Sequence, residues 1–273
     1  MEPASTSPTI FSSEPRTASE FAALVEPVVP GLSSVQIDQL LQYRDMLHGR
    51  NQRVNLTAVR DFDGIERRLI LESLRLVPVM KSLTPEAGSV MDLGSGGGIP
   101  GVILAIAMPD CSFTLLDATG KKVMFQRDVI EGIGLTNVRA VQGRAEELGH
   151  DINWRNAFDV VSARAVTSLS ALMELGLPFV SMKGWLVLPK GVEIEEELGI
   201  ARKAAGKLGG TIVSHDVMDD AGTDVDTRLV LVRKDQATPS DYPRRVGLPA
   251  RSPLGSPQDQ ANAKGKQRKR GNG

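Results

Sequence analysis

The sequence predicts an α/β fold with a seven-stranded, mostly parallel sheet, an antiparallel last strand and an N-terminal helical extension. Three observations support this prediction. From Ser89 onward, short apolar runs alternate with amphipathic segments, which is typical of strands joined by crossover helices. The last two apolar runs are joined by the Asp- and Gly-rich residues 218–227 and not by a helix, which indicates an antiparallel hairpin at the sheet edge. Before Ser89, apolar residues recur at helical spacing.

The helical extension is expected to contain three helical stretches, over residues 20–27, 33–49 and about 62–80. Ser33 and Ser34 are suitable N-caps for the second stretch, and Gly49 is a suitable stop. Residues 1–19 are rich in Ser, Thr and Pro and lack the apolar core of a signal peptide. We therefore expect a disordered leader before the helices.

The sheet region is expected to contain strands at residues 89–93, 112–116, 137–141, 158–162, 184–188, 210–217 and 228–233. Helices are expected at residues 100–108, 120–132, 144–148, 168–178 and 193–209. Right-handed crossovers between such strands give a parallel sheet. Six crossover strands with an antiparallel seventh are the arrangement of the Rossmann-like class I methyltransferases. The sequence thus predicts four parts: a leader over 1–19, a helical extension over 20–87, a ligand-binding domain over 88–234 and a Pro-, Gly- and Arg-rich tail with little regular structure over 235–273.

The composition is that of an ordinary globular protein, with 41% hydrophobic and 24% charged residues. No stretch approaches the roughly 18 to 20 apolar residues that cross a bilayer, so a cytoplasmic protein is expected. Cys111 is the only cysteine, and the three histidines lack metal-ligand spacing. The sequence therefore predicts neither an internal disulfide nor a metal site.

The charge distribution leaves room for a nucleic-acid partner. The net charge is −1, but residues 264–270 carry five basic side chains and no acid. A nearly neutral protein with a cationic tail can bind RNA through local patches. The same tail could equally be a solvated end of the chain.

The strongest local signal is the stretch Val90-Met-Asp-Leu-Gly-Ser-Gly-Gly-Gly-Ile-Pro-Gly101. An apolar strand ends in Asp92, a glycine-rich turn follows, and Pro100 stands where a helix begins, a position that proline favours. Glycines let the backbone turn sharply and approach a ligand closely, and the free N–H groups of such a turn can bind a carboxylate or phosphate. Asp92 could accept a hydrogen bond from the ammonium group of an amino-acid-like ligand.

Two ligands compete for this glycine loop. Gly96, Gly98 and Gly101 satisfy the dinucleotide pattern GxGxxG, which any glycine-rich stretch meets easily. Asp92 would repel a pyrophosphate, whereas S-adenosylmethionine has no phosphate and carries an ammonium group. The residues therefore favour S-adenosylmethionine over a dinucleotide, with a purely structural glycine turn as the third alternative.

Two further positions fit an adenosine-containing ligand. Asp117 closes the second strand, where an acid can accept from both ribose hydroxyls, although it could instead cap the helix that begins near Thr119. Ala145 and Glu146 follow the third strand, where they could lie along an adenine or simply begin a solvated helix.

Arg164 follows the fourth strand, within Val161-Ser-Ala-Arg-Ala-Val166. Many amino-group methyltransferases carry Asn-Pro-Pro-Tyr or a relative at this place, and this chain does not. An arginine here could grip a guanine edge or a phosphate with its planar cation, or it could pair with a nearby acid.

Together, several motifs resemble the RsmG family, formerly called glucose-inhibited division protein B (GidB). They are Asn55-Leu-Thr-Ala-Val-Arg60, Asp92-Leu-Gly-Ser-Gly-Gly-Gly-Ile-Pro-Gly101, Leu116-Asp-Ala-Thr-Gly-Lys-Lys122, Ala163-Arg-Ala165 and Tyr242-Pro-Arg-Arg245 followed by Pro249. The similarity covers roughly residues 35–253. It implies an S-adenosylmethionine-dependent rRNA (guanine-N7) methyltransferase that acts on 16S ribosomal RNA or the 30S ribosomal subunit and releases S-adenosylhomocysteine. It also implies donor contacts at Gly94, Ile99, Asp117, Ala118, Thr119, Ala145, Glu146 and Arg164.

The chemistry of guanine N7 agrees with the absence of an obvious catalytic His or Cys. N7 carries a lone pair and no proton, so attack on a methyl sulfonium needs no general base. Catalysis would then rest on in-line positioning, which contributes up to ~7–11 kcal/mol in well-oriented systems. Arg164 is the one candidate for a catalytic residue, through positioning of the target.

One position departs from the family pattern, and several residues could contact RNA. Many members have a histidine near Arg68, where this chain has Leu69. If that histidine contributes to RNA binding, His48 or Arg67 could substitute for it. The basic residues expected near the RNA backbone are Arg53, Arg60, Lys121, Lys122, Arg127, Lys190, Arg244 and Arg245. The alternatives to an RNA methyltransferase are a small-molecule or protein methyltransferase of the same fold, a nucleotide-dependent oxidoreductase, and a non-enzymatic ribosome assembly factor.

Overall fold

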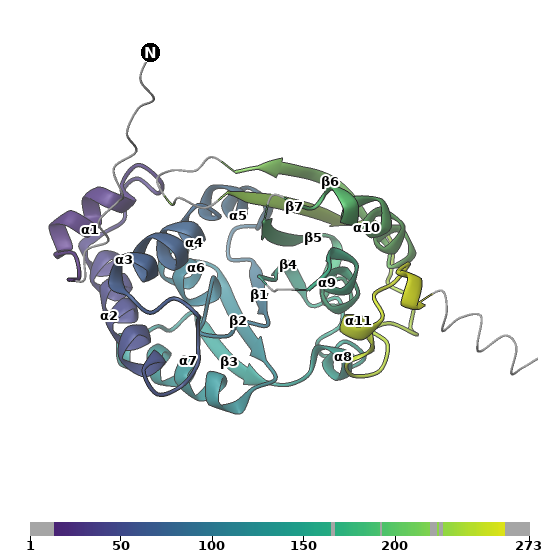
Figure 1. Cartoon of the computed structure of the whole chain (residues 1–273), viewed down its shortest axis with the longest axis horizontal. Helices are drawn as coiled ribbons and strands as arrows, with labels where there is room; N and C mark the ends of the chain where they lie inside the picture. The colour runs from purple at the N-terminus through teal and green to yellow at the C-terminus, as the bar shows by residue number, and fades with distance from the viewer. Residues whose placement is uncertain (1–13, 165–166, 192, 219–222, 224–225, 260–273) are drawn as a thin grey trace, which may run out of the picture.

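The architecture is a single seven-stranded sheet with helices on both faces (Figure 1). The computed structural model describes residues 14–164, 167–191, 193–218, 223 and 226–259. The strands are β1 (Ser89–Leu93), β2 (Ser112–Asp117), β3 (Val138–Gln142), β4 (Phe158–Ser162), β5 (Val180–Gly191), β6 (Gly210–Val217) and β7 (Thr227–Lys234). Their spatial order is β3-β2-β1-β4-β5-β7-β6. This is the Rossmann-like methyltransferase arrangement that the sequence predicts.

The strand directions confirm the expected hairpin. β1 to β5 pair in parallel, and β7 runs antiparallel to both β5 and β6. β7 therefore lies inside the sheet, and β6 forms its edge. β5 begins four residues before the apolar run that predicted it, because Val180 already pairs with Phe158 of β4. The register shifts between this pair and the next one, Val160 with Trp185, and the side chains of residues 181–183 in between are partly or fully exposed.

Two hydrophobic cores cover the two faces of the sheet. One face packs against α6 (Gly101–Ala107), α7 (Gly120–Ile133) and the helices of the extension. The opposite face packs against α9 (Leu169–Gly176) and α10 (Glu195–Lys207). The short helix α8 (Ala145–Leu148) follows β3. The extension thus shares its core with one face of the sheet.

The extension contains α1 (Ala18–Val25), α2 (Ser34–Asn51), α3 (Phe62–Gly64), a π-helical segment η1 (Ile65–Leu71), α4 (Glu72–Leu74) and α5 (Val77–Leu83). Ser33 is the N-cap of α2, one of the two caps that the sequence offers, and it forms a capping box with Gln36. The helix continues past Gly49 to Asn51. The helical stretch expected over about 62–80 is helical over residues 62–74 and 77–83, and η1 forms its π-helical part. It is interrupted at Arg75 and Leu76, because Pro78 lacks the N–H that would continue the preceding helix.

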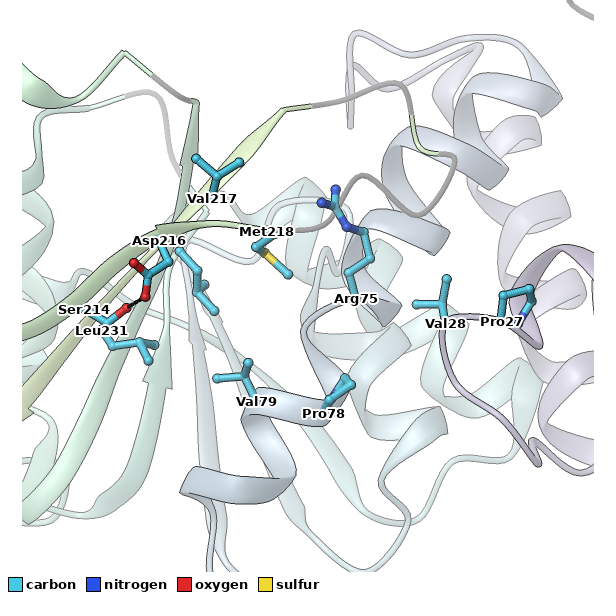
Figure 2. Close-up of a pocket in the computed structure, with 11 residues that line it drawn as sticks. Pro27, Val28, Arg75, Pro78, Val79, Ser214, Asp216, Val217, Met218 and Leu231 are labelled. Atoms are coloured by element: carbon cyan, nitrogen blue, oxygen red, sulfur yellow. Dashed lines mark hydrogen bonds between the residues drawn. The ribbon is translucent and has the colours of Figure 1, made fainter.

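A pocket of about 450 Å³ lies between the β6–β7 hairpin and the extension (Figure 2). Val28 and Pro78 border it on the extension side, and Val217 borders it on the hairpin side. None of the residues that the sequence assigns to a functional site lines this pocket.

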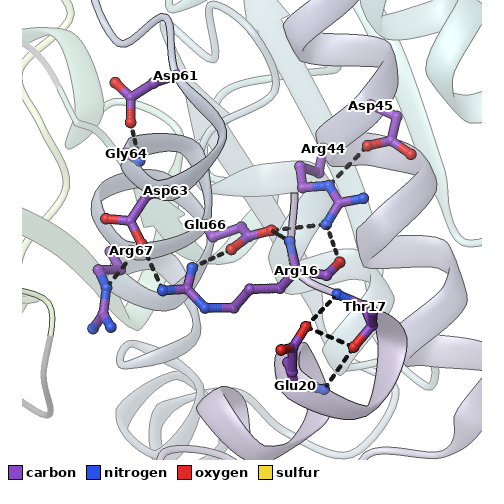
Figure 3. A network of polar contacts seen from close by, with 10 residues as sticks. All are labelled: Arg16, Thr17, Glu20, Arg44, Asp45, Asp61, Asp63, Gly64, Glu66 and Arg67. Atoms are coloured by element: carbon purple, nitrogen blue, oxygen red, sulfur yellow. Dashed lines mark hydrogen bonds and ion pairs between the residues drawn. The ribbon is translucent and has the colours of Figure 1, made fainter. Parts of the chain in front are cut away.

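Arg16 anchors the start of the described chain to the extension (Figure 3). Its guanidinium pairs with Asp63 at 2.6 Å and also with Glu66, which is fully buried. Arg44 donates to Glu66 at 2.7 Å and to the Arg16 carbonyl at 2.9 Å. The expected disordered leader is therefore wrong for residues 14–19, because composition does not reveal a long-range ion pair. Residues 1–13 lie outside the described residues.

Residues after β7 return across the molecule to α8 and α9 (Figure 1). Arg244 donates to both carboxylate oxygens of the fully buried Glu174 on α9, and it also pairs with Asp259. This segment includes the short helix α11 (Leu248–Arg251), where little regular structure is expected. The basic residues 264–270 lie outside the described residues. No helix that the described residues form has the length and apolar character of a membrane span.

We predict that Arg16→Ala lowers the free energy of unfolding by about 1–3 kcal/mol, because it removes charge-assisted bonds to a buried carboxylate. Denaturant unfolding measures the change. Arg50→Ala is the matched control, since its pair with Asp128 is 39% and 44% exposed and should contribute less than about 1 kcal/mol. Equal losses for the two variants would show that the Arg16 anchor adds nothing beyond a surface pair.

Candidate active site

The glycine loop, residues 94–101, joins β1 to α6 at the carboxyl edge of the sheet. Gly94, Gly96 and Gly98 have φ angles of 73°, 56° and 86°, a region that side-chain-bearing residues rarely adopt. The N–H groups of Gly94 and Ser95 donate to the Leu116 carbonyl at 2.8 and 3.2 Å. The loop is therefore tied to the end of β2, next to Asp117.

Asp92 lies beneath the glycine loop and is only 1% exposed. Its Oδ2 accepts from the Gly101 N–H at 2.9 Å, which ties the loop to the start of α6. Burial raises the pKa of Asp92 to about 7; the Gly101 bond opposes this shift, Asp117 adds to it and Arg164 opposes it. Among the described residues, Oδ1 has no hydrogen-bond partner. An unpaired buried acceptor is costly, so this oxygen suits a cationic donor group of a ligand.

Asp117 connects the glycine loop to the turn after β2. Its Oδ2 accepts from the Gly96 N–H at 2.9 Å, and its Oδ1 accepts from the Thr119 N–H at 2.8 Å. The N-cap residue of α7 is Thr119, so Asp117 binds the turn before the helix and is not its N-cap. Each carboxylate oxygen retains a lone pair that a hydroxyl group could use. Ala118 is half-buried and Thr119 is exposed in the same turn.

Ala145 and Glu146 begin α8, directly after β3 and Arg144. Ala145 is buried, and Glu146 is half-buried. The Oε1 of Glu146 accepts from the Gly247 N–H at 2.8 Å. Glu146 is therefore not a solvated helix start, because it holds the C-terminal segment with one of its two carboxylate oxygens.

Arg164 bridges the end of β4 and the extension. Its Nη2 donates to the Arg68 carbonyl in η1 at 3.1 Å. Burial lowers the pKa of the Arg164 guanidinium, while the carboxylates of Glu72 and Asp92 act in the opposite direction. None of the acids in the described part of the chain forms an ion pair with it. The salt-bridge alternative therefore finds no partner there.

Two polar side chains at this edge were not expected from the sequence. Ser162, the last residue of β4, pairs in register with Asp92 and is fully buried. Gln126 on α7 donates to the Ser95 Oγ and the Gly96 carbonyl, both at 2.8 Å. The Ser162 Oγ and Gln126 Oε1 have no partner among the described residues. A polar residue on the apolar face of α7 was the available signal for Gln126.

The basic residues expected near RNA separate into two groups. Arg53, Arg60, Lys121, Arg127 and Arg245 are exposed, whereas Lys122 and Lys190 are half-buried. Arg244 is committed to Glu174 and Asp259, so the expectation that it contacts RNA is not supported.

The two candidates to replace a family histidine have other partners. His48 stacks on Phe62 with 4.0 Å between ring centroids, and Arg67 pairs with Asp63. Leu69 is buried in the extension. Within the described ranges, no group of three or more His, Cys, Asp and Glu side chains could hold a metal ion.

Comparison with known proteins gives consistent similarities. The family model described as "rRNA small subunit methyltransferase G" matches residues 36–221. The chain is 38% identical over 223 residues to the "Ribosomal RNA small subunit methyltransferase G" of Alkaliphilus oremlandii, covering 82% of this chain and 92% of the relative. The protein of that name from Chloroflexus aggregans is 40% identical with the same coverage, and the one from Lactococcus lactis subsp. lactis is 34% identical, covering 87% and 99%. Among solved structures, TrmN from Thermus thermophilus is 17% identical with a TM-score of 0.47, covering 59% of this chain and 48% of that one.

We predict that Asp92→Asn removes the part of the pH dependence of folding stability that arises from protonation of Asp92. The ordinary pKa of this carboxyl group is 3.8 and the folded value is about 7, so between these pH values the folded chain binds the proton more tightly. Wild-type stability should then fall as pH rises through this window, by at most about 1.4 kcal/mol per pH unit. Thermal melting from pH 5 to pH 8 should show the variant gaining on the wild type. Parallel curves would contradict the raised pKa.

Proposed function

The chain belongs to the rRNA small subunit methyltransferase G family, and we propose that it transfers a methyl group from S-adenosylmethionine to N7 of a guanine in 16S ribosomal RNA. The observation that carries this proposal is the arrangement of Asp92, the glycine loop and Asp117 at one edge of the sheet. This arrangement offers acceptors to an ammonium group and to ribose hydroxyls. Membership of a methyltransferase family argues against the oxidoreductase alternative.

The residues present fit S-adenosylmethionine, which supplies a methyl group on a positively charged sulfur. The Oδ1 of Asp92, which has no partner among the described residues, suits the ammonium group. The positive-φ glycines of the loop from Gly94 to Ile99 let its backbone approach the carboxylate closely. Asp117 suits the ribose, beside Ala118 and Thr119. At the end of β3, Ala145 and Glu146 would border the adenine.

Arg164 is the residue proposed to position the target. Its bond to the Arg68 carbonyl orients the guanidinium plane while leaving further N–H donors. Those donors could hold guanine O6 or a phosphate, and N7 would then face the methyl group. Since N7 needs no deprotonation, the task of these residues is alignment and not proton transfer.

The exposed basic residues Arg53, Arg60, Lys121, Arg127 and Arg245 are proposed to contact the phosphates of the 16S RNA or of the 30S subunit. Each such contact adds a salt-dependent increment without reading sequence. A ribosomal substrate would place the enzyme in the cytoplasm.

We expect Asp117→Ala to weaken S-adenosylhomocysteine binding by about 1–3 kcal/mol, because the substitution removes ribose acceptors and frees the Gly96 N–H. Calorimetry measures the affinity, and the wild type should show no binding of NAD. Asp128→Ala is the matched control on α7, since its partly exposed carboxylate pairs with Arg50. Unchanged affinity in Asp117→Ala would show that Asp117 only binds the backbone of the glycine loop and does not contact the ligand.

Arg164→Ala and Arg164→Lys should both slow methylation more than tenfold while leaving melting temperatures close to that of the wild type. Lysine keeps the charge but lacks the planar guanidinium with its several N–H donors. A tenfold lower rate corresponds to an activation free energy that is higher by about 1.4 kcal/mol. Single-turnover methylation of 30S particles gives the rates, and nucleoside analysis should identify N7-methylguanosine in 16S RNA. Methylation at another atom would contradict the proposed function. Wild-type rates in both variants would leave the proposed function intact but would show that Arg164 does not position the target.

A further inference from the structure

The N-terminal extension forms the underside of the glycine loop. Tyr43 on α2 is fully buried, and its hydroxyl donates to the Gly97 carbonyl at 2.8 Å. A Cβ atom at Gly97 would lie 3.2 Å from Leu47 Cδ1 and 3.7 Å from Leu56 Cβ. The extension therefore contacts the backbone of the loop directly.

Asn51 holds part of this underside in place. Its side-chain oxygen accepts from the N–H groups of Leu56 and Thr57 at 2.9 and 3.1 Å. Its Nδ2 donates to the carbonyls of Thr57 and Val59 at 3.0 and 2.9 Å. The side chain thus folds the turn that presents Leu56 to Gly97, within the motif Asn55–Arg60. In this structure, part of that motif supports the loop.

The peptide between Gly97 and Gly98 is held at both ends. Tyr43 binds its carbonyl, and its N–H donates to the Ser95 carbonyl at 2.7 Å. Glycine peptides rotate easily because no Cβ restricts them. Burial raises the pKa of Tyr43, and the Asp92 carboxylate raises it further, so the hydroxyl stays protonated and remains a donor.

We propose that Tyr43 is a positioning residue for the methyl donor, acting through the Gly97 carbonyl. The bond keeps this carbonyl pointing into the extension and away from the side on which the donor carboxylate would lie. Without the bond, the buried carbonyl has no other hydrogen-bond partner among the described residues, and the peptide can turn its negative end toward the donor carboxylate. This inference rests on the proposed function, and it makes the extension part of the donor site.

The experiment compares Tyr43→Phe with Thr238→Val. Thr238 provides a matched control, because its buried hydroxyl donates to the Leu208 carbonyl, also at 2.8 Å, on the other face of the sheet. Both variants should lose similar amounts of melting temperature. Tyr43→Phe alone should weaken S-adenosylhomocysteine binding, by about 5- to 30-fold in calorimetry. In methylation of 30S particles it should raise the KM for S-adenosylmethionine more than it lowers kcat.

Equal affinities in folded Tyr43→Phe and wild type would overturn the proposal. If Tyr43→Phe does not fold, Gly97→Ala tests the proposal instead. The added methyl group would lie too close to Leu47 and would displace the loop from the extension. Gly49→Ala is its control, since a Cβ there meets nothing within 4 Å. Weaker binding in Gly97→Ala but not in Gly49→Ala supports the proposal, and equal binding overturns it. A wild type that binds no S-adenosylhomocysteine would instead overturn the proposed function.

Discussion

Two carboxylates bind the backbone of the glycine loop, and the candidate site depends on them. Asp92 accepts from the Gly101 N–H, and Asp117 accepts from the Gly96 N–H. The parallel register places both acids at one edge, since Asp92 pairs with Leu115 two residues before Asp117. Burial and the Asp117 carboxylate raise the pKa of Asp92, while the Gly101 N–H and Arg164 act in the opposite direction. The loop is consequently fixed by charge as well as by glycine geometry.

Much of the fold follows from the sequence, because alternating apolar runs and glycine turns are local signals. β1, β4 and β6 have the expected bounds, and the hairpin direction is correct. The predictions from the sequence are wrong where contacts between residues far apart in the chain determine the structure. The start of β5 depends on pairing with β4, and the order of residues 14–19 depends on the Arg16 pairs. The spacing of apolar residues does not distinguish the π-helical turns of η1 from α-helical turns, so the sequence predicts only a helical stretch there.

The site was predictable where strand ends carry the chemistry. Asp92, Asp117 and Arg164 lie at or just after the ends of β1, β2 and β4. These strands pair in parallel, so the three residues lie at one edge of the sheet. Ser162 and Tyr43 were missed because each looks like an ordinary core or strand residue until its neighbour is known. Arg244 was expected near RNA, and the sequence did not reveal that its guanidinium binds Glu174, because this acid lies 70 positions earlier.

The pairing of Glu174 with Arg244 has a consequence for the order in which the chain leaves the ribosome. α9 is synthesised with a carboxylate that the finished protein buries completely, and its guanidinium partner follows 70 residues later. Until Arg244 emerges, α9 cannot reach its final packing without an uncompensated charge. The same late segment supplies the Gly247 N–H that holds Glu146. A chain that ends at β7 therefore contains every strand of the sheet but lacks these bonds.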